Sequence, residues 1–194
     1  MNRRELIKGL TAIGALSILP SSILFGQAQD KPLHFIGIGD AGRKVLKHIH
    51  QKKIPAKYTC IACSCWHLPW YNSSVLPEDI HVIQLSHIGS SYESEDTSYG
   101  QLTFIESYLQ TPMKVSTEVT DLFKDDNRYI LLAGLGGFTG TFLAEKLTLM
   151  LDENKKDFLT ICSLPFSFEG KKRSTWANKV RQNLRSIPNV KYFD

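Results

Sequence analysis

The segment 129–142, which reads YILLAGLGGFTGTF, combines glycines and threonines at a spacing that could hold a phosphate group. Its apolar run 130–133 predicts a buried strand, and residues 143–151 predict a helix whose positive end points at the same place. Glycines between them let backbone N–H groups approach an anion, and hydroxyl groups add donors. The residues concerned are Gly134, Gly136, Gly137, Thr139, Gly140 and Thr141. Such turns also serve packing alone, so this segment by itself leaves both interpretations open.

A second glycine turn follows the apolar segment 33–38, with G-x-G-x-x-G spacing over residues 37–42. This spacing occurs in dinucleotide-binding units, where an acidic residue at the end of the next strand holds the ribose. The next predicted strand, 58–64, runs instead into Cys65 and Trp66. The sequence therefore disfavours NAD, and a nicotinamide-dependent oxidoreductase is kept only as an alternative.

Cys63, Cys65 and His67 alternate along one predicted strand, so their side chains would share a face and invite a metal site. Structural zinc sites usually draw on two separate pairs of ligands, however, and Cys162 stands alone in another strand. We therefore expect buried, packed thiols and no metal site. The six histidines are scattered without an apparent partner, so the sequence predicts no catalytic residue.

The elements that must position these residues alternate along the chain. Apolar runs predict strands at 33–38, 58–64, 81–85, 130–133, 158–162 and 190–193, and helix-spaced apolar positions predict helices after residue 42 and at 102–109, 115–123, 143–151 and 174–184. This alternation predicts an α/β fold with a three-layer, doubly wound, mostly parallel sheet. The 194 residues are 42% hydrophobic and carry a net charge of +4, which indicates one ordinary domain with no basic patch for nucleic acid.

Residues 1–28 have the three parts of an export signal: a basic start, an apolar run at 10–25 and a small-x-small site at 26–28. Arg3 and Arg4 in NRRELIK resemble the twin-arginine signal. The apolar run is short for a bilayer span and contains Pro20, which favours a cleaved signal over a permanent anchor. We expect a domain at 29–194 that is exported to the periplasm, with membrane contact only through the signal; a cytoplasmic protein is the alternative.

Two motifs resemble the tubulin/FtsZ family. AGLGGFTGTF, at 133–142, resembles a signature that reads close to AGMGGGTGTG in bacterial FtsZ, and LPFSFEGKKR, at 164–173, is similar to the family's KPFSFEGKKR. With the turn at 37–42, where FtsZ reads close to GVGGGGGNAV, the resemblance extends over 31–194. It implies the N-terminal nucleotide-binding domain of the family, with GTP or GDP, with or without Mg²⁺, and with self-association or another protein partner.

The resemblance also implies which residues contact the nucleotide. The two glycine turns would hold the phosphates, and the glutamate and arginine of FEGKKR would contact the ribose and its surroundings. The predicted cofactor-binding residues are Gly39, Asp40, Ala41, Gly42, Gly136, Gly137, Thr139, Gly140, Thr141, Glu169 and Arg173.

The chain departs from the family within both glycine turns. Asp40 replaces a glycine and brings a carboxylate near the phosphates, which is unfavourable unless it points outward or a cation offsets it. Arg43 and Lys44 are placed to compensate, although a solvated first helical turn is an equal alternative. Phe138 also replaces a glycine; its side chain could occlude the site, and a positive φ there would add strain. If it does occlude the site, the domain is a degenerate, nucleotide-free interaction module.

Other departures concern hydrolysis. FtsZ has an acid where residues 64–66 stand, and a glycine-rich loop contacts the terminal phosphate where this chain has the polar segment 89–99. That segment is either a solvated loop or a set of cation ligands. The family continues beyond the equivalent of residue 194 into a second domain that completes the GTPase site. The resemblance therefore implies weak or no GTPase activity by this chain alone.

Overall fold

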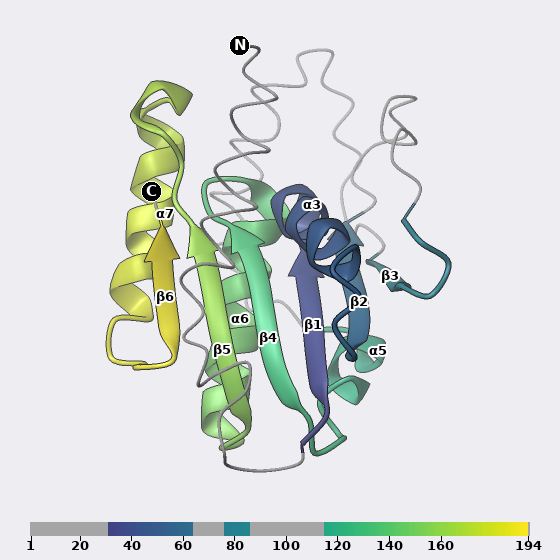
Figure 1. Ribbon diagram of the computed structural model, residues 1–194. Helices are drawn as coiled ribbons and strands as arrows, with labels where there is room; N and C mark the ends of the chain where they lie inside the picture. Colours follow the sequence, from purple (N-terminus) through teal and green to yellow (C-terminus); the bar gives the residue numbers. More distant parts are fainter. Residues whose placement is uncertain (1–30, 64–75, 86–114, 194) are drawn as a thin grey trace.

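The computed structural model describes residues 31–63, 76–85 and 115–193 (Figure 1). Several predictions fall outside this range and stay predictions. They concern the export signal at 1–28, the side chains of Cys65 and His67, the polar segment 89–99 and the helix at 102–109.

Six parallel strands form one sheet, with the spatial order β3-β2-β1-β4-β5-β6. The chain builds outward from β1 to one edge, then crosses to β4 and builds outward to the other. This is the doubly wound arrangement that the alternating pattern predicts. The strands are β1 (Leu33–Ile38), β2 (Lys57–Cys63), β3 (His81–Leu85), β4 (Arg128–Gly134), β5 (Asp157–Ser163) and β6 (Val190–Phe193).

Helices cover both faces of the sheet and make it the middle of three layers (Figure 1). Helix α3 packs on the face to which Phe35, Cys60 and Leu132 point. Helices α6 and α7 pack on the other face, against the strand residues that alternate with these. The helices are α3 (Gly39–His50), α5 (Thr117–Asp121), α6 (Phe138–Glu153) and α7 (Lys171–Asn183), with the short 3₁₀ helix η2 (Ser167–Glu169) before α7.

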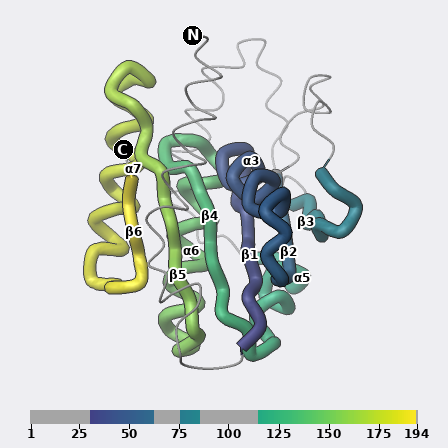
Figure 2. Tube along the Cα trace, in the orientation of Figure 1, coloured from purple at the N-terminus to yellow at the C-terminus, as the bar shows by residue number. Residues whose placement is uncertain are grey.

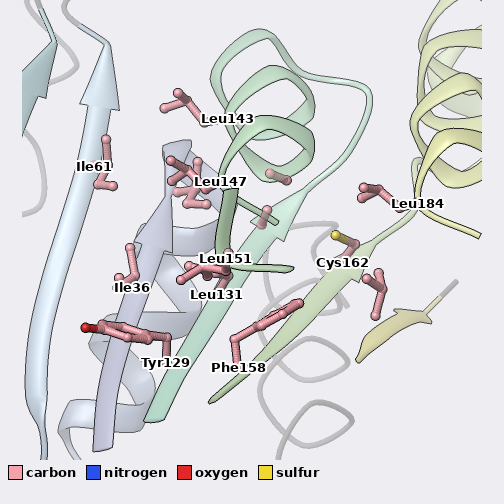
Figure 3. Close-up of a cluster of buried hydrophobic side chains, with 14 of the residues drawn as sticks. Ile36, Ile61, Tyr129, Leu131, Leu143, Leu147, Leu151, Phe158, Cys162 and Leu184 are labelled. Carbon is pink, nitrogen blue, oxygen red and sulfur yellow. The ribbon is translucent and has the colours of Figure 1, made fainter. Parts of the chain in front are cut away.

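The larger of the two cores lies between the sheet and α6 (Figure 3). Leu143, Leu147 and Leu151 recur at helical spacing on α6 and are fully buried in one cluster with Leu131 of β4. Leu184, just after α7, joins the same cluster. Burial on both faces explains why the central strands read as continuous apolar runs. Among the described residues, no helix has the length and apolar character needed to cross a bilayer.

Four helices differ in extent from the sequence prediction, among them α5, which covers Thr117–Asp121 where the sequence predicts a helix at 115–123. Helix α6 starts at Phe138 rather than at residue 143, and α7 starts at Lys171 rather than at 174. Helix α3 begins at Gly39, so the G-x-G-x-x-G turn forms its first turn. Glycines do not favour a helix by local propensity, but here they let the first helical turns press against the strand ends. Packing against the strand ends therefore accounts for the early starts of α3 and α6.

Candidate functional site

The two glycine turns lie side by side at the point where the strand order reverses. Strands β1 and β4 are neighbours in register, with Ile38 opposite Ala133, and each leads into a helix (Figure 2). Gly39 has a φ of +68°, and a Cβ at that position would lie 3.2 Å from the backbone nitrogen of Gly140. Crevices at such switch points are where open α/β sheets bind ligands.

Gly42 and Gly140 have a packing role that needs no ligand. A Cβ at Gly42 would lie 2.2 Å from the carbonyl oxygen of Leu132, and a Cβ at Gly140 would lie 2.2 Å from that of Gly134. Both distances are far below van der Waals contact, so only glycine lets α3 and α6 approach β4 this closely. The presence of these two glycines is therefore explained by the fold.

The turn after β4 is ordered by Thr141, one of the predicted phosphate-binding residues. The N–H of Gly136 donates to the hydroxyl oxygen of Thr141 at 2.8 Å, and Thr141 is buried. Gly136 has a φ of +90°, which favours glycine. Thr141 therefore orders the turn from inside, while the half-buried Thr139 stays at the surface of the turn.

Gly137 is the open position of this turn. A Cβ there would meet no atom within 4 Å apart from those of its chain neighbours Gly136 and Phe138, and its φ of −94° is available to any residue. Gly137 caps α6, whose first backbone N–H groups lack partners within the helix by their position. Donors and the positive end of the helix dipole thus meet open space here, a combination that attracts anions.

The segment 164–173, which contains the third group of predicted site residues, lies against the glycine turn after β4. A Cβ at Gly136 would lie 3.1 Å from the Cβ of Pro165 and 3.2 Å from that of Arg173. Glu169 accepts from the backbone N–H of Phe166 at 3.2 Å and from Arg173 Nη1 at 3.0 Å. The fold therefore brings together predicted site residues that follow β1, β4 and β5.

Asp40 is compensated in the way that its neighbours suggest. Arg43 Nη2 donates to Asp40 Oδ1 at 2.6 Å, and Lys44 Nζ donates to Oδ2. Partial burial raises the pKa of Asp40, but the hydrogen bonds from Lys44 and Arg43 more than offset burial, so the pKa lies below its ordinary value. The carboxylate is therefore ionised at neutral pH and held between two cations.

The two phenylalanines of the signature differ in role. Phe142 packs against the large core. Phe138 is the first residue of α6 and is half-buried, and its φ is not positive, so the expected left-handed strain is absent. What remains of the sequence argument is the bulk of the Phe138 side chain beside the open turn.

The cysteines that the structure describes fully are buried thiols, as the sequence predicts. Burial raises the pKa of Cys60 to about 11 and that of Cys162 to about 12, which leaves both unreactive at neutral pH. Within 31–63, 76–85 and 115–193, no group of three metal-binding side chains gathers in a suitable arrangement.

A cleft of about 1000 Å³ lies at the opposite end of the strands from the glycine turns. Two hydrogen-bonded pairs belong to its lining: His34 Nε2 lies 2.9 Å from Thr59 Oγ1, and His50 Nε2 lies 2.7 Å from Asp79 Oδ2. Sequence reasoning missed this cleft because its residues come from separate segments with no shared motif. Its position makes it independent of the predicted phosphate site.

No family model matches the chain, and no curated protein matches its sequence. Solved structures do match. CetZ from Methanosaeta thermophila strain DSM 6194 superposes with a TM-score of 0.57 at 13% identity, over 84% of this chain and 46% of CetZ. The empty FtsZ dimer of M. jannaschii superposes with a TM-score of 0.52 at 18% identity, over 99% of this chain and 50% of the FtsZ chain. The chain has a tubulin/FtsZ-like fold.

A third tubulin/FtsZ-like structure, the GDP-bound monomer of CetZ1 from Haloferax volcanii, superposes with a TM-score of 0.53 at 22% identity, over 84% of this chain and 51% of CetZ1. The chain thus spans about half the length of each of these structures. Identities this low establish the fold, whereas a function has to be argued from the residues of the site.

Proposed function

We propose that this chain binds the phosphates of a guanine nucleotide, GTP or GDP, where the two glycine turns meet. The observation that carries the proposal is the contact of Gly39 with Gly140, which aims the N-termini of α3 and α6 at one edge of the sheet. Two helix ends with free N–H groups favour an anion there. The GDP bound in the structure of CetZ1 supports a guanine nucleotide as the first ligand to test.

The predicted site residues take two kinds of role in this proposal. Gly39, Gly137 and Thr139 would face the phosphates, with Asp40 and Ala41 on the exposed rim. Arg173, which lies beside Gly136, and Glu169, which accepts a hydrogen bond from Arg173, would contact the ribose. The remaining members shape the turns from within: Gly42, Gly136, Gly140 and Thr141.

We propose weak or no GTP hydrolysis by these residues alone. An effective general base has a pKa near the working pH. The pairing of Asp40 with Arg43 and Lys44 holds the pKa of this carboxyl below its ordinary value, which makes Asp40 a weak base. Glu169 is held by the backbone N–H of Phe166 and by Arg173. Self-association, seen in the FtsZ dimer, is the partner interaction we propose, with Mg²⁺ as a companion of the nucleotide.

A nucleotide-free interaction module is the second candidate. The observation that favours it is Phe138, whose ring stands at the N-terminus of α6, where the tubulin/FtsZ signature has glycine. Export to the periplasm, which is poor in GTP, would favour it as well. In this case the glycine turns serve packing only, as Gly42 and Gly140 already do.

Calorimetric titration of the full chain with GTP, GDP and NADH, with and without Mg²⁺, tests these proposals. We expect micromolar binding of a guanine nucleotide. Thr139→Val should weaken it about tenfold or more, because a hydroxyl bond to a charged phosphate is lost. Thr120→Val, on α5, is the matched control and should leave the affinity unchanged. Binding of NADH alone would favour an oxidoreductase. No binding of GTP, GDP or NADH would overturn nucleotide binding.

A further inference from the structure

The first turn of α3 contains a negatively charged side chain, the carboxylate of Asp40. Asp40 is half exposed and makes ion pairs with Arg43, three residues on, and Lys44, four residues on. The Lys44 side chain is 63% exposed and the Arg43 side chain 14%. Asp40 therefore engages a surface cation and a largely buried one with the same carboxylate.

This cluster lies at the edge of the joined glycine turns. Asp40 follows Gly39, which lies against Gly140, and the Cβ of Ala41 would be 2.5 Å from a Cβ at Gly134. The start of α3 is the positive end of the helix dipole, so a carboxylate there occupies the position that favours an anion. It also takes up hydrogen-bond donors of the two cations nearest to that position.

We propose that Asp40 is an internal anion that competes with the phosphate ligand for Arg43 and Lys44 and thereby sets the affinity of the site. This inference rests on the proposed binding of phosphates at the glycine turns. When a phosphate approaches the start of α3, the charge of Asp40 partly cancels the positive charge of Arg43 and Lys44. Arg43 Nη2 and Lys44 Nζ also already donate to Asp40. Removing the carboxylate charge leaves more of the positive charge of Arg43 and Lys44 for the ligand and releases the donors that Arg43 Nη2 and Lys44 Nζ give to Asp40, and salt screens this gain.

The test compares the full chain with Asp40→Asn, which keeps the shape of the side chain and removes its charge. Titrations with GDP, GTP and inorganic pyrophosphate in low-salt buffer with EDTA measure the affinities. We expect Asp40→Asn to bind about tenfold more tightly than the unmodified chain, with a smaller gain at high salt. Asp121→Asn is the matched control, because Asp121, the last residue of α5, also pairs with a lysine three residues on, Lys124, but lies away from the glycine turns.

A second variant separates competition from a structural role of Asp40. If Asp40 competes with the ligand for Lys44, Lys44→Gln should change the affinity for the phosphate ligand little in the unmodified chain. In the Asp40→Asn background, the same change should remove much of the gain in affinity. A purely structural Asp40, which only stabilises the start of α3, predicts a lower melting temperature in Asp40→Asn and no gain in affinity.

The outcomes keep the inference apart from the proposed function. Binding by the unmodified chain with no tighter binding by Asp40→Asn overturns the inference and leaves the function standing. If the unmodified chain shows no binding and Asp40→Asn binds, the inference is supported, because the Asp40 carboxylate then blocks the site. If neither the unmodified chain nor Asp40→Asn binds GDP, GTP or pyrophosphate, the function and the inference are overturned together.

Discussion

Phe138 is the residue at which the two proposed functions separate. It replaces a glycine of the tubulin/FtsZ signature, yet it adopts ordinary helical backbone as the first residue of α6. Its cost to ligand binding is therefore steric and not conformational. The neighbouring Gly137 is open, so the ring at 138 decides how much of that space a phosphate can enter.

Replacing Phe138 with glycine should strengthen or create guanine-nucleotide binding, because the change removes bulk beside the open N–H groups of α6. Replacing it with tryptophan should weaken binding by adding bulk. Calorimetric titration with GDP measures both, and circular dichroism checks that the helix persists, since glycine lowers helix propensity by about 1 kcal/mol. Equal affinities in both variants would show that the ring does not limit access to the turn.

His34 should make the stability depend on pH. Burial, followed by the nearby charge of Lys57, lowers its pKa from 6.5 to about 4, against the opposing effect of Asp125. Between these values the unfolded chain binds the proton and the native chain does not, so the free energy of unfolding rises with pH. The contribution is fully present above about pH 6.5, and about 3 kcal/mol is lost as the pH falls through 4.

Urea unfolding of the full chain at pH 7.5, 5.5 and 4 measures this dependence. His34→Gln cannot take up a proton and keeps a hydrogen-bonding group near Thr59 Oγ1, which His34 Nε2 contacts at 2.9 Å. Its free energy of unfolding should vary less over this range. An unchanged pH profile in His34→Gln would assign the dependence to other groups.

At the scale of elements, α3 starts directly after β1, and three residues separate the end of β4 from the start of α6. This is possible because Gly42 and Gly140 present no side chain to the carbonyl groups of β4. The same close approach aims both helix ends at one edge of the sheet. Packing and the proposed anion site thus depend on the same glycines.

Gly140→Ala should lower the free energy of unfolding by about 2 kcal/mol, within the range typical of overpacked sites, because its Cβ would lie 2.2 Å from the carbonyl oxygen of Gly134. Gly137→Ala is the matched control in the same turn; it meets open space with a negative φ and should change stability by less than about 0.5 kcal/mol. Urea unfolding midpoints measure both. Equal effects of the two variants would contradict the packing role of Gly140.

At the scale of the whole molecule, we propose export through the twin-arginine signal that residues 1–28 resemble. Such signals are addresses read by a receptor, and a conservative change can abolish them. Changing both Arg3 and Arg4 to lysine should keep the full chain in the cytoplasm, whereas Lys8→Arg should not. Cell fractionation with immunoblotting measures the difference. Equal export of both variants would rule out this route.

The sequence by itself determined the class of fold and much of its element order. The predicted strands at 33–38, 81–85 and 190–193 have the observed bounds, because strand patterning is local. Burial on both faces accounts for the apolar run of β1, whereas the edge strands β3 and β6 are partly exposed. The pairing of Asp40 with Arg43 and Lys44 was also within reach of the sequence, since residues three and four apart are neighbours on a helix.

Only the tertiary structure decided how the glycine turns are used. That Gly39 lies against Gly140 depends on a contact between segments far apart in the chain. The cleft around His34 has the same origin. The bond from Gly136 to Thr141 spans only five residues, but the residue pattern alone did not show that Thr141 is buried or that α6 begins at Phe138. Local patterns record which face of an element is apolar, whereas the distance between a helix end and a strand end is set by packing across the whole sheet.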